Sequence, residues 1–313
     1  MSDYSKDKIS FVIPIYNAAK TVERLIFEIT NNCEKINVDF EVILVDDCGH
    51  DNSWDIIEQI CLQNTSVKAI KLSRNFGQHA AITAGLEIIQ YEYVVVMDCD
   101  LQDRPDQIPK LYDHIRNTDA DIVLAKRTQR QDSLSKRLSS KYFYKTLSYF
   151  TNTTQDSSVA NYGIYRKQAI DEVVRMGDFV RFFPLFIRWV GFNIDYIEVQ
   201  HSSRDEGKSN YTLRKLWTLA LDNIISFSNK PLYLTINLGL IIIVSSFLGI
   251  IINLYKYFTG SIEILGYTSI IVIFSFLFGI VIFILGVIGI YIAKIFDQVK
   301  GRQIYIIKKK LNI

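Results

Sequence analysis

The sequence predicts an α/β protein with a mainly parallel β-sheet, interfacial amphipathic helices and two C-terminal transmembrane helices. Two observations support this fold class. Short apolar strands alternate with helical segments through the first half of the 313-residue chain, and such alternation is typical of right-handed crossovers between parallel strands. Two later stretches, Leu232–Leu254 and Ser269–Ala293, contain no charged residue, although 22% of the whole chain is charged.

The predicted strands are short runs rich in Ile and Val, which is typical of strands buried on both faces of a sheet. They are Ile9–Ile15, Phe40–Val45, Val67–Leu72, Tyr93–Met97 and Ile122–Ala125. Helical patterns separate them at Ala18–Cys33, Trp54–Gln63, Gly77–Gln90 and Ile108–Asn117. In sheets of this kind ligands bind at the carboxyl ends of the strands, and pairs of acidic residues stand at two of these ends.

Two stretches that mix aromatic and basic residues, Lys136–Phe150 and Tyr211–Phe227, have helical patterns. One interpretation is that both helices pack on the sheet. The other is that they lie in the membrane interface, where aromatic rings enter the apolar layer and Lys or Arg side chains reach the headgroups. The two uncharged stretches that follow favour the interfacial interpretation.

The two uncharged stretches each approach the roughly 20 residues that a helix needs to cross about 30 Å of hydrocarbon. Basic residues flank the outer ends of the pair, whereas the loop between them has only Lys256 and Glu263 as charges. The positive-inside rule therefore predicts a multi-pass protein of the cytoplasmic (inner) membrane with both termini in the cytoplasm. The expected parts are a sheet domain (1–135), a part with interfacial helices (136–230), two spans (231–254 and 269–293), a short extracytoplasmic loop (255–268) and a basic cytoplasmic tail (294–313).

The composition excludes several classes of protein. The polar N-terminus has no apolar segment of the kind found in signal peptides, and the four cysteines form no CxxC pair. We therefore expect reduced thiols in a cytosolic domain. The formal net charge is only +2, the charges are mixed and no nucleic-acid-binding motif occurs, so we expect no nucleic acid partner.

The strongest local signal is the pair Asp98 and Asp100, which follows the apolar strand Tyr93–Met97. Two carboxylates that enter a turn from a strand end can converge on one point. Carboxylate oxygens suit Mg²⁺ or Mn²⁺ that bridges to a diphosphate, and the cation would neutralise charge on a leaving nucleoside diphosphate. The alternative is a solvated turn that is merely rich in Asp.

Two further turns fall at carboxyl ends of predicted strands. Asp46 and Asp47 could accept an N–H group of a nucleotide base, or they could cap the following helix, which Asp51 or Ser53 could do instead. The segment Pro14-Ile-Tyr-Asn17 is expected as a turn after the first strand, and it could line a nucleotide pocket or merely turn the chain. All three turns belong to one predicted sheet, which strengthens each of them.

Four segments together resemble the glycosyltransferases of family 2, which have the Rossmann-like GT-A fold. They are Phe11–Asn17, Leu44–Asp47, Leu72–His79 and Met97–Asp103. The resemblance covers nearly the whole chain, both spans included. It points to the polyprenyl-phosphate branch, with the dolichyl-phosphate mannose synthases, the O-antigen bactoprenol glucosyltransferases and the undecaprenyl-phosphate formamido-arabinose transferases. The combined motifs are specific for this class but not for the sugar.

The resemblance implies roles for individual residues. The nucleotide-sugar would be bound by Pro14, Tyr16, Asp46, Asp47, Asp98, Arg204 and Lys208. The metal, Mg²⁺ or Mn²⁺, would be bound by Asp98, Asp100 and Gln102. The acceptor phosphate would be bound by Arg127, Arg137 and Ser140, since arginine forks match phosphate oxygens. For Arg137, contact with lipid headgroups is the alternative.

The chain departs from the family at two places. The family usually has Gly-x-Ser-Lys where this chain has Gly207-Lys-Ser-Asn210, so Lys208 stands two positions earlier. Some relatives carry an Asp, proposed as a catalytic base, where this chain has Asn161. Asn cannot take a proton in that role. We expect Asn161 to position a substrate while Asp98, Asp100 and the metal assist catalysis, because a lipid phosphate is already an anion near pH 7.

The sequence therefore predicts a metal-dependent, inverting membrane enzyme that moves one sugar from a nucleotide-sugar to a polyprenyl phosphate for cell-envelope glycan or lipid modification. By resemblance, the donor is UDP-linked, the acceptor is undecaprenyl phosphate and the protein is a homo-oligomer, with a tetramer as the expected form. One alternative is a processive polysaccharide synthase, but Leu185–Trp189 lacks the Gln expected three residues before Arg188. The other is a non-catalytic, nucleotide-binding membrane protein.

Overall fold

The computed structural model describes residues 6–127, 149–150, 159–199, 224–225, 228–259 and 267–313. The chain divides into two units, which are described separately. The first combines Met1–Thr212 with Arg302–Ile313, and the second is Leu213–Gly301. Both stretches predicted as interfacial helices lie almost wholly outside the described residues, so that prediction stays open.

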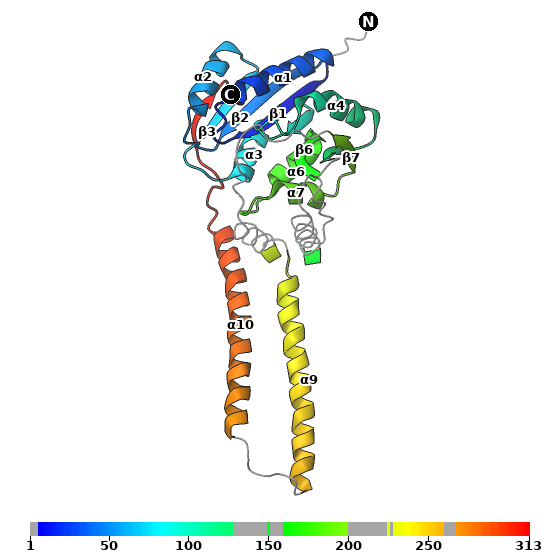
Figure 1. Ribbon diagram of the computed structural model, residues 1–313, viewed down its shortest axis with the longest axis vertical. Helices are drawn as coiled ribbons and strands as arrows, with labels where there is room; N and C mark the ends of the chain where they lie inside the picture. The colour runs from blue at the N-terminus through cyan, green and yellow to red at the C-terminus, as the bar shows by residue number, and fades with distance from the viewer. Residues whose placement is uncertain (1–5, 128–148, 151–158, 200–223, 226–227, 260–266) are drawn as a thin grey trace. The chain divides into compact units, whose positions relative to one another are not determined.

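The described part of the first unit contains one sheet of eight strands in the order β7-β5-β6-β4-β1-β2-β3-β8 (Figure 1). β1 is parallel to β2 and β4, β2 is parallel to β3, and β5 is parallel to β7. β6 is antiparallel to β4 and β5, and β8 is antiparallel to β3. The strands are β1 (Lys8–Ile15), β2 (Asp39–Asp46), β3 (Val67–Leu72), β4 (Tyr93–Val96), β5 (Ile122–Arg127), β6 (Val159–Arg166), β7 (Ile194–Val199) and β8 (Ile307–Leu311).

Helices connect and cover these strands, as the alternating sequence pattern predicts. They are α1 (Val22–Lys35), α2 (Ser53–Gln63), α3 (Gln78–Leu86), the short 3-10 helix η1 (Pro105–Gln107), α4 (Ile108–Asn117), α6 (Lys167–Arg175) and α7 (Phe183–Trp189). The predictions for β3 and α4 match to the residue. Helix α3 is shorter than the predicted Gly77–Gln90, because the chain leaves it after Leu86 to reach β4.

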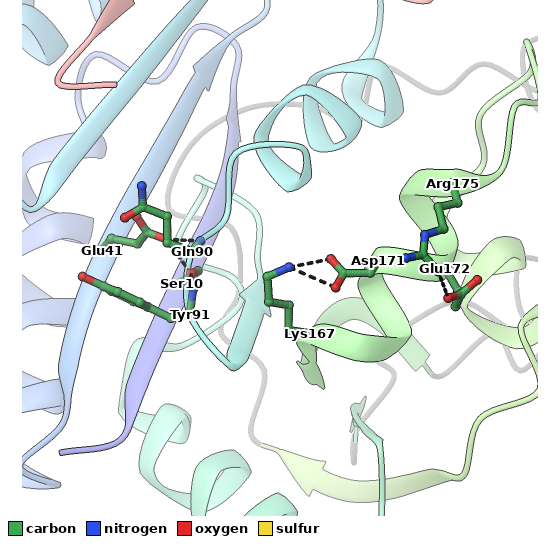
Figure 2. A network of polar contacts seen from close by, with 8 residues as sticks. All are labelled: Ser10, Glu41, Gln90, Tyr91, Lys167, Asp171, Glu172 and Arg175. Carbon is green, nitrogen blue, oxygen red and sulfur yellow. Dashed lines mark hydrogen bonds and ion pairs between the residues drawn. The ribbon is translucent and has the colours of Figure 1, made fainter. Parts of the chain in front are cut away.

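A buried polar network holds the turn between α3 and β4 at the amino ends of the central strands (Figure 2). Glu41 is 1% exposed. Its carboxylate accepts hydrogen bonds from the Ser10 hydroxyl at 2.6 Å and the Gln90 backbone N–H at 2.8 Å, and it pairs with the Lys68 ammonium group at 2.6 Å. The Ser10 hydroxyl in turn accepts a bond from the Tyr91 backbone N–H. One Glu41 oxygen is thus engaged by hydrogen bonds and the other by the ion pair, so the network stabilises the fold at the end opposite the acidic turns.

The antiparallel strand β6 was not predicted from the sequence. It lies between β4 and β5, and Gly163 allows the close approach: a Cβ atom there would lie 2.8 Å from the Val123 carbonyl oxygen. The chain then enters α6, where Lys167 pairs with Asp171 at 2.7 Å and Arg175 pairs with Glu172 (Figure 2). A glycine inside a strand resembles a turn signal in sequence, which is why this strand was missed.

The prediction of a basic tail at 294–313 needs correction, because this segment is helix and then strand. Helix α10 (Tyr267–Val299) continues past Ala293, and β8 pairs with the outer edge of β3. The Lys309 ammonium group lies 2.5 Å from the Glu58 carboxylate, and the Asn312 side chain donates to the carbonyl oxygens of Cys61 and Val67, both at 2.8 Å. Without β8, the edge groups of β3 would lack backbone partners.

The second unit contains α9 (Lys230–Phe258) and α10. One segment of the described residues, Phe276–Val299 in α10, is long and apolar enough to cross a membrane, and none of it is buried inside the structure. An apolar helix that contacts so little protein is unlike a core helix. Helix α10 also contains the whole of the second predicted span, Ser269–Ala293, which is thus supported as a helix. The first span, Leu232–Leu254, stays a prediction.

The close packing of α3 on the sheet gives a first test. A Cβ atom at Gly85 would lie 2.5 Å from a methyl group of Val12 and 3.2 Å from one of Val45. Gly85→Ala would gain about 1 kcal/mol in helix propensity but would overpack the interface at a cost of about 1–3 kcal/mol. We expect net destabilisation, measured by thermal unfolding in detergent. The control is Gly177→Ala, where a Cβ atom would meet no heavy atom within 4 Å. Equal stability of the two variants would contradict this packing.

Candidate active site

Two acidic turns follow β2 and β4, the two strands that flank β1. The parallel register pairs Ile15 of β1 with Asp46, and Val12 with Val96, two residues before Asp98. The carboxyl ends of all three strands therefore meet at one edge of the sheet, as predicted. Asp46 and Asp47 are almost fully buried there, at 2% and 3% exposure.

The segment after β1 is hydrogen-bonded to the turn after β2. Pro14 and Ile15 lie inside β1, so the predicted turn begins only at Tyr16. Asn17 has a φ of 53°, and its side-chain oxygen accepts a hydrogen bond from the His50 backbone N–H at 2.8 Å. A Cβ atom at Gly49 would lie 2.8 Å from that oxygen, so only glycine fits this contact. The Tyr16 ring is 41% exposed and available to a ligand.

Asp51 binds the first residue of helix α2. The Asp51 carboxylate accepts bonds from the Ser53 hydroxyl at 2.6 Å, the Ser53 backbone N–H at 3.2 Å and the Ala19 backbone N–H at 3.0 Å. Burial alone would raise the pKa of Asp51, but these hydrogen bonds outweigh it and lower the pKa. The capping alternative for Asp46 and Asp47 is therefore wrong, because Asp51 fills that role.

Asp47 instead holds the loop between β3 and α3. Its two carboxylate oxygens accept hydrogen bonds from the backbone N–H groups of Phe76 at 2.7 Å and Gly77 at 2.9 Å. Burial raises the pKa of Asp47, and the two hydrogen bonds offset part of this effect. Burial also raises the pKa of Asp46, whose carboxylate has a longer contact of 3.5 Å with the Gly49 backbone N–H. The two neighbours thus differ. Asp47 holds the loop between β3 and α3 through two hydrogen bonds, whereas Asp46 makes one longer contact, with the Gly49 N–H.

The turn after β4 is shaped by its own carboxylates. The Asp103 carboxylate accepts a hydrogen bond from the Asp98 backbone N–H at 3.3 Å, and the Asp100 carboxylate accepts one from the Gln102 backbone N–H at 3.2 Å. Leu101 has a φ of 58°, which makes the turn tight. The Gln78 side chain, from the first residue of α3, donates to Asp98 Oδ1 at 2.6 Å. Gln78 was missed as a site residue, although it lies within the motif Leu72–His79.

The turn after β4 presents carboxylate oxygens rather than thiolates. Burial raises the pKa of Cys99 to about 12, so the thiol between the two aspartates stays protonated at neutral pH. Within the described ranges, no three or more His, Cys, Asp or Glu side chains group as metal ligands. Asp98 and Asp100 thus stand in this turn as two half-buried carboxylates.

The structure also locates the acceptor-side predictions that it describes. Arg127 is the last residue of β5 and pairs with Val199. Asn161 lies in β6, two residues before Gly163, which pairs with Val96. Because β6 runs antiparallel to β4, Asn161 stands at the strand-end edge that carries Asp98. The side chains of Arg127 and Asn161, and all of Arg137, Ser140, Arg204 and Lys208, lie outside the described residues.

Residues 10–174, more than half of the chain, match the model of glycosyl transferase family 2. The chain belongs to glycosyltransferase family 2. It is therefore an enzyme, as the acidic strand ends indicate. The α/β sheet with its largely parallel central strands is the GT-A-like arrangement that the resemblance implied.

Curated relatives of this family 2 enzyme match nearly end to end. The uncharacterized glycosyltransferase YkcC of Bacillus subtilis is 34% identical over 97% of this chain and 94% of its own length. The undecaprenyl-phosphate 4-deoxy-4-formamido-L-arabinose transferase of Proteus mirabilis is 30% identical over 100% and 97%. The prophage-derived bactoprenol glucosyl transferase of Shigella flexneri is 31% identical over 96% and 98%. These names agree with the expected polyprenyl-phosphate branch.

Solved structures support the fold. The crystal structure of glucosyl-3-phosphoglycerate synthase from Mycobacterium tuberculosis with Mn²⁺, UDP-glucose and phosphoglyceric acid superposes with a TM-score of 0.51. It covers 70% of this chain and 78% of that one at 14% sequence identity. At this identity the likeness establishes a shared fold and nothing about the substrate.

A half-buried histidine beside the site gives a pH test. The His79 ring packs edge-on against Phe182 with centroids 4.9 Å apart, and its Nδ1 atom is buried without a hydrogen-bond partner. Burial lowers the pKa of His79 from 6.5 to about 4. Below pH 6.5 the unfolded chain binds a proton that the folded enzyme does not, so stability falls as the pH drops from 6.5 to about 4.

We therefore expect His79→Phe to flatten the loss of stability in this pH window, measured by thermal unfolding at a series of pH values. The control is His50→Phe at an exposed position, which should keep the wild-type slope. A His79→Phe variant that loses stability as steeply as the wild type would contradict the burial of a neutral ring.

Proposed function

We propose that this enzyme moves a single sugar from a UDP-linked donor to undecaprenyl phosphate at the cytoplasmic face of the cytoplasmic membrane, with inversion at the anomeric carbon. The observation that carries the proposal is the convergence of Asp46, Asp98 and Asp100 at one edge of the sheet. The relatives supply the acceptor class: two of them are named for different sugars, formamido-arabinose and glucose, and both names specify a polyprenyl carrier. The acceptor is therefore better supported than the sugar.

A divalent cation, Mg²⁺ or Mn²⁺, fits the donor set after β4. Mg²⁺ is usually bound by one or two carboxylates together with substrate phosphates, which matches Asp98 and Asp100 with a bound diphosphate. Gln102 would complete the protein ligands. When bound, the cation would neutralise charge on the leaving nucleoside diphosphate. The protein's own part is to hold the carboxylates in fixed positions, so that little reorganisation accompanies the transfer.

The nucleoside would lie between the turns after β1 and β2, against Pro14 and the exposed Tyr16 ring. Asp46 is the better of the two aspartates to accept a base N–H, because both Asp47 oxygens already accept backbone N–H groups. Arg204 and Lys208 would neutralise charge on the diphosphate.

The acceptor phosphate would be bound by Arg127, with Arg137 and Ser140 from the adjoining segment. It arrives as an anion, so it needs orientation more than deprotonation. Asn161, at the same edge as Asp98, would donate a hydrogen bond that orients the acceptor, since an amide cannot serve as the base. This assignment leaves the lipid phosphate oxygen as the nucleophile that attacks the anomeric carbon.

The membrane would deliver the acceptor. We propose that α9 spans the bilayer as well as α10, through residues 231–254, with residues 255–268 outside and both termini in the cytoplasm. Small residues in α10, Gly279, Gly286 and Gly289, would permit close helix packing in a homo-oligomer. A tetramer is the expected form.

The direct test is a donor screen with the full-length protein in detergent. Undecaprenyl phosphate, Mn²⁺ and a panel of nucleotide-sugars are incubated with the enzyme, and the lipid product is weighed by mass spectrometry. We expect a mass increase of one sugar from one donor. We expect Asp100→Asn to lower the rate by at least about 100-fold, the effect of removing a group that stabilises developing charge. Asp106→Asn, at an exposed carboxylate near the same turn, is the control and should stay active.

Two outcomes would contradict the proposal. Products that carry many sugars would identify a processive synthase. Binding of a nucleotide without any transfer, from every donor in the panel, would leave a non-catalytic protein.

A further inference from the structure

Gln78 is a polar side chain that contacts a site carboxylate from outside the acidic turns. It is the first residue of α3, and Asp98 lies 20 positions later in the chain. Its side-chain N–H donates to Asp98 Oδ1 at 2.6 Å, a short distance for a bond of this type. A contact that joins two separate segments at this point can control where the carboxylate lies.

We propose that Gln78 is a positioning residue that orients Asp98 for the cation, and that Asp47 holds Gln78 in place. This inference rests on the proposed function, because it presumes that a divalent cation binds at Asp98 and Asp100. It assigns Asp47 a structural role in metal binding, besides any contact with the nucleotide.

The first step is the effect of the hydrogen bond on the carboxylate. An amide N–H that binds Oδ1 restricts the rotation of the Asp98 side chain, and with it the direction in which the carboxylate faces a cation. Because the amide is neutral, it adds no positive charge that would repel the cation, as Lys or Arg in its place would. Groups that orient a metal ligand from behind typically change metal affinity or activity 10- to 100-fold when mutated.

The second step is the fixed position of Gln78 itself. The residue before it, Gly77, has a φ of 95°, which favours glycine because side chains of L-residues crowd the backbone there. The Asp47 carboxylate accepts the backbone N–H groups of Phe76 and Gly77 and so sets this turn. A chain of contacts thus runs from Asp47 through Gly77 and Gln78 to Asp98.

The third step is that α3 offers a rigid base. The close contact of Gly85 with Val12 fixes the helix on β1. Before the helix, the Ser73 backbone N–H donates to the Ile306 carbonyl oxygen at 2.8 Å, which ties the start of the loop to the segment before β8. With both ends of the 73–86 segment anchored, the backbone of Gln78 is held in place relative to the sheet.

The test measures Mn²⁺ binding to the full-length protein in detergent. The electron paramagnetic resonance signal of free Mn²⁺ is the readout, and UDP is present at a saturating concentration for each variant. Gln78→Met keeps the length of the side chain and removes the donor. We expect it to weaken Mn²⁺ binding about 10- to 100-fold and to raise the Mn²⁺ concentration for half-maximal transfer, with activity recovering at high Mn²⁺. A merely structural role would lower activity at every Mn²⁺ concentration.

The matched control is Gln107→Met. The Gln107 side chain also donates to a neighbouring carboxylate, Asp106, at 3.0 Å, but on the exposed surface. We expect it to bind Mn²⁺ as the wild type does. Asp47→Asn, which replaces one acceptor oxygen by a donor beside the Gly77 N–H, should weaken Mn²⁺ binding in the same direction as Gln78→Met.

Failure of this inference can be told apart from failure of the proposed function. If Asp98→Asn loses Mn²⁺ while Gln78→Met binds it within about twofold of the wild type, Gln78 has no positioning role. If Asp98→Asn also keeps its Mn²⁺, the cation does not bind at Asp98 and the inference fails with it. If the Mn²⁺ effects occur as expected but no sugar reaches any lipid, the inference stands and the proposed reaction is wrong.

Discussion

The parallel pairing of β1 with both of its neighbours is the constraint on which the site depends. Parallel strands end at the same edge, so the turns after β1, β2 and β4 must meet there. The register fixes how they meet: Ile15 stands beside Asp46, and Val12 beside Val96. Buried carboxylates are costly to group in this way, and the hydrogen bonds from Gly77, Phe76 and Gln78 are what hold them.

The first half of the fold could be predicted because its strands are buried on both faces and appear as continuous apolar runs. β3 matches to the residue for this reason. α4 also matches, because its buried residues Ile108, Leu111, Tyr112 and Ile115 follow the spacing of one helix face. The later strands β6 and β8 could not be predicted, because their sequences lack a continuous apolar run. β6 contains Gly163 and two buried tyrosines, and β8 contains three consecutive lysines, which resemble a tail. An edge strand with solvated side chains has almost no apolar pattern for sequence reasoning to detect.

The candidate site likewise has features that the sequence predicts and features that it does not. The positions of Asp46, Asp98 and Asp100 follow from strand ends, which are local features of the sequence. The partners of Asp47 and Asp98 lie 20 to 30 residues away, and no local pattern reveals such contacts. The sequence therefore predicts the carboxylates but not Gln78. It predicts that Asp47 contacts the nucleotide, but not that Asp47 binds the backbone of Phe76 and Gly77. The roles of Arg127, Arg137, Ser140, Arg204 and Lys208 remain predictions from the family resemblance.

The central claim is that the converging strand ends form one site for a nucleoside diphosphate and a divalent cation. The most direct measurement is the calorimetric affinity of the full-length protein for UDP, GDP, CDP and dTDP, each with Mn²⁺ and with a chelator. We expect one of them to bind at least about tenfold more tightly with Mn²⁺, because the cation bridges Asp98 and Asp100 to the diphosphate. If none of the four binds more tightly with Mn²⁺ than with the chelator, the account of this site is contradicted.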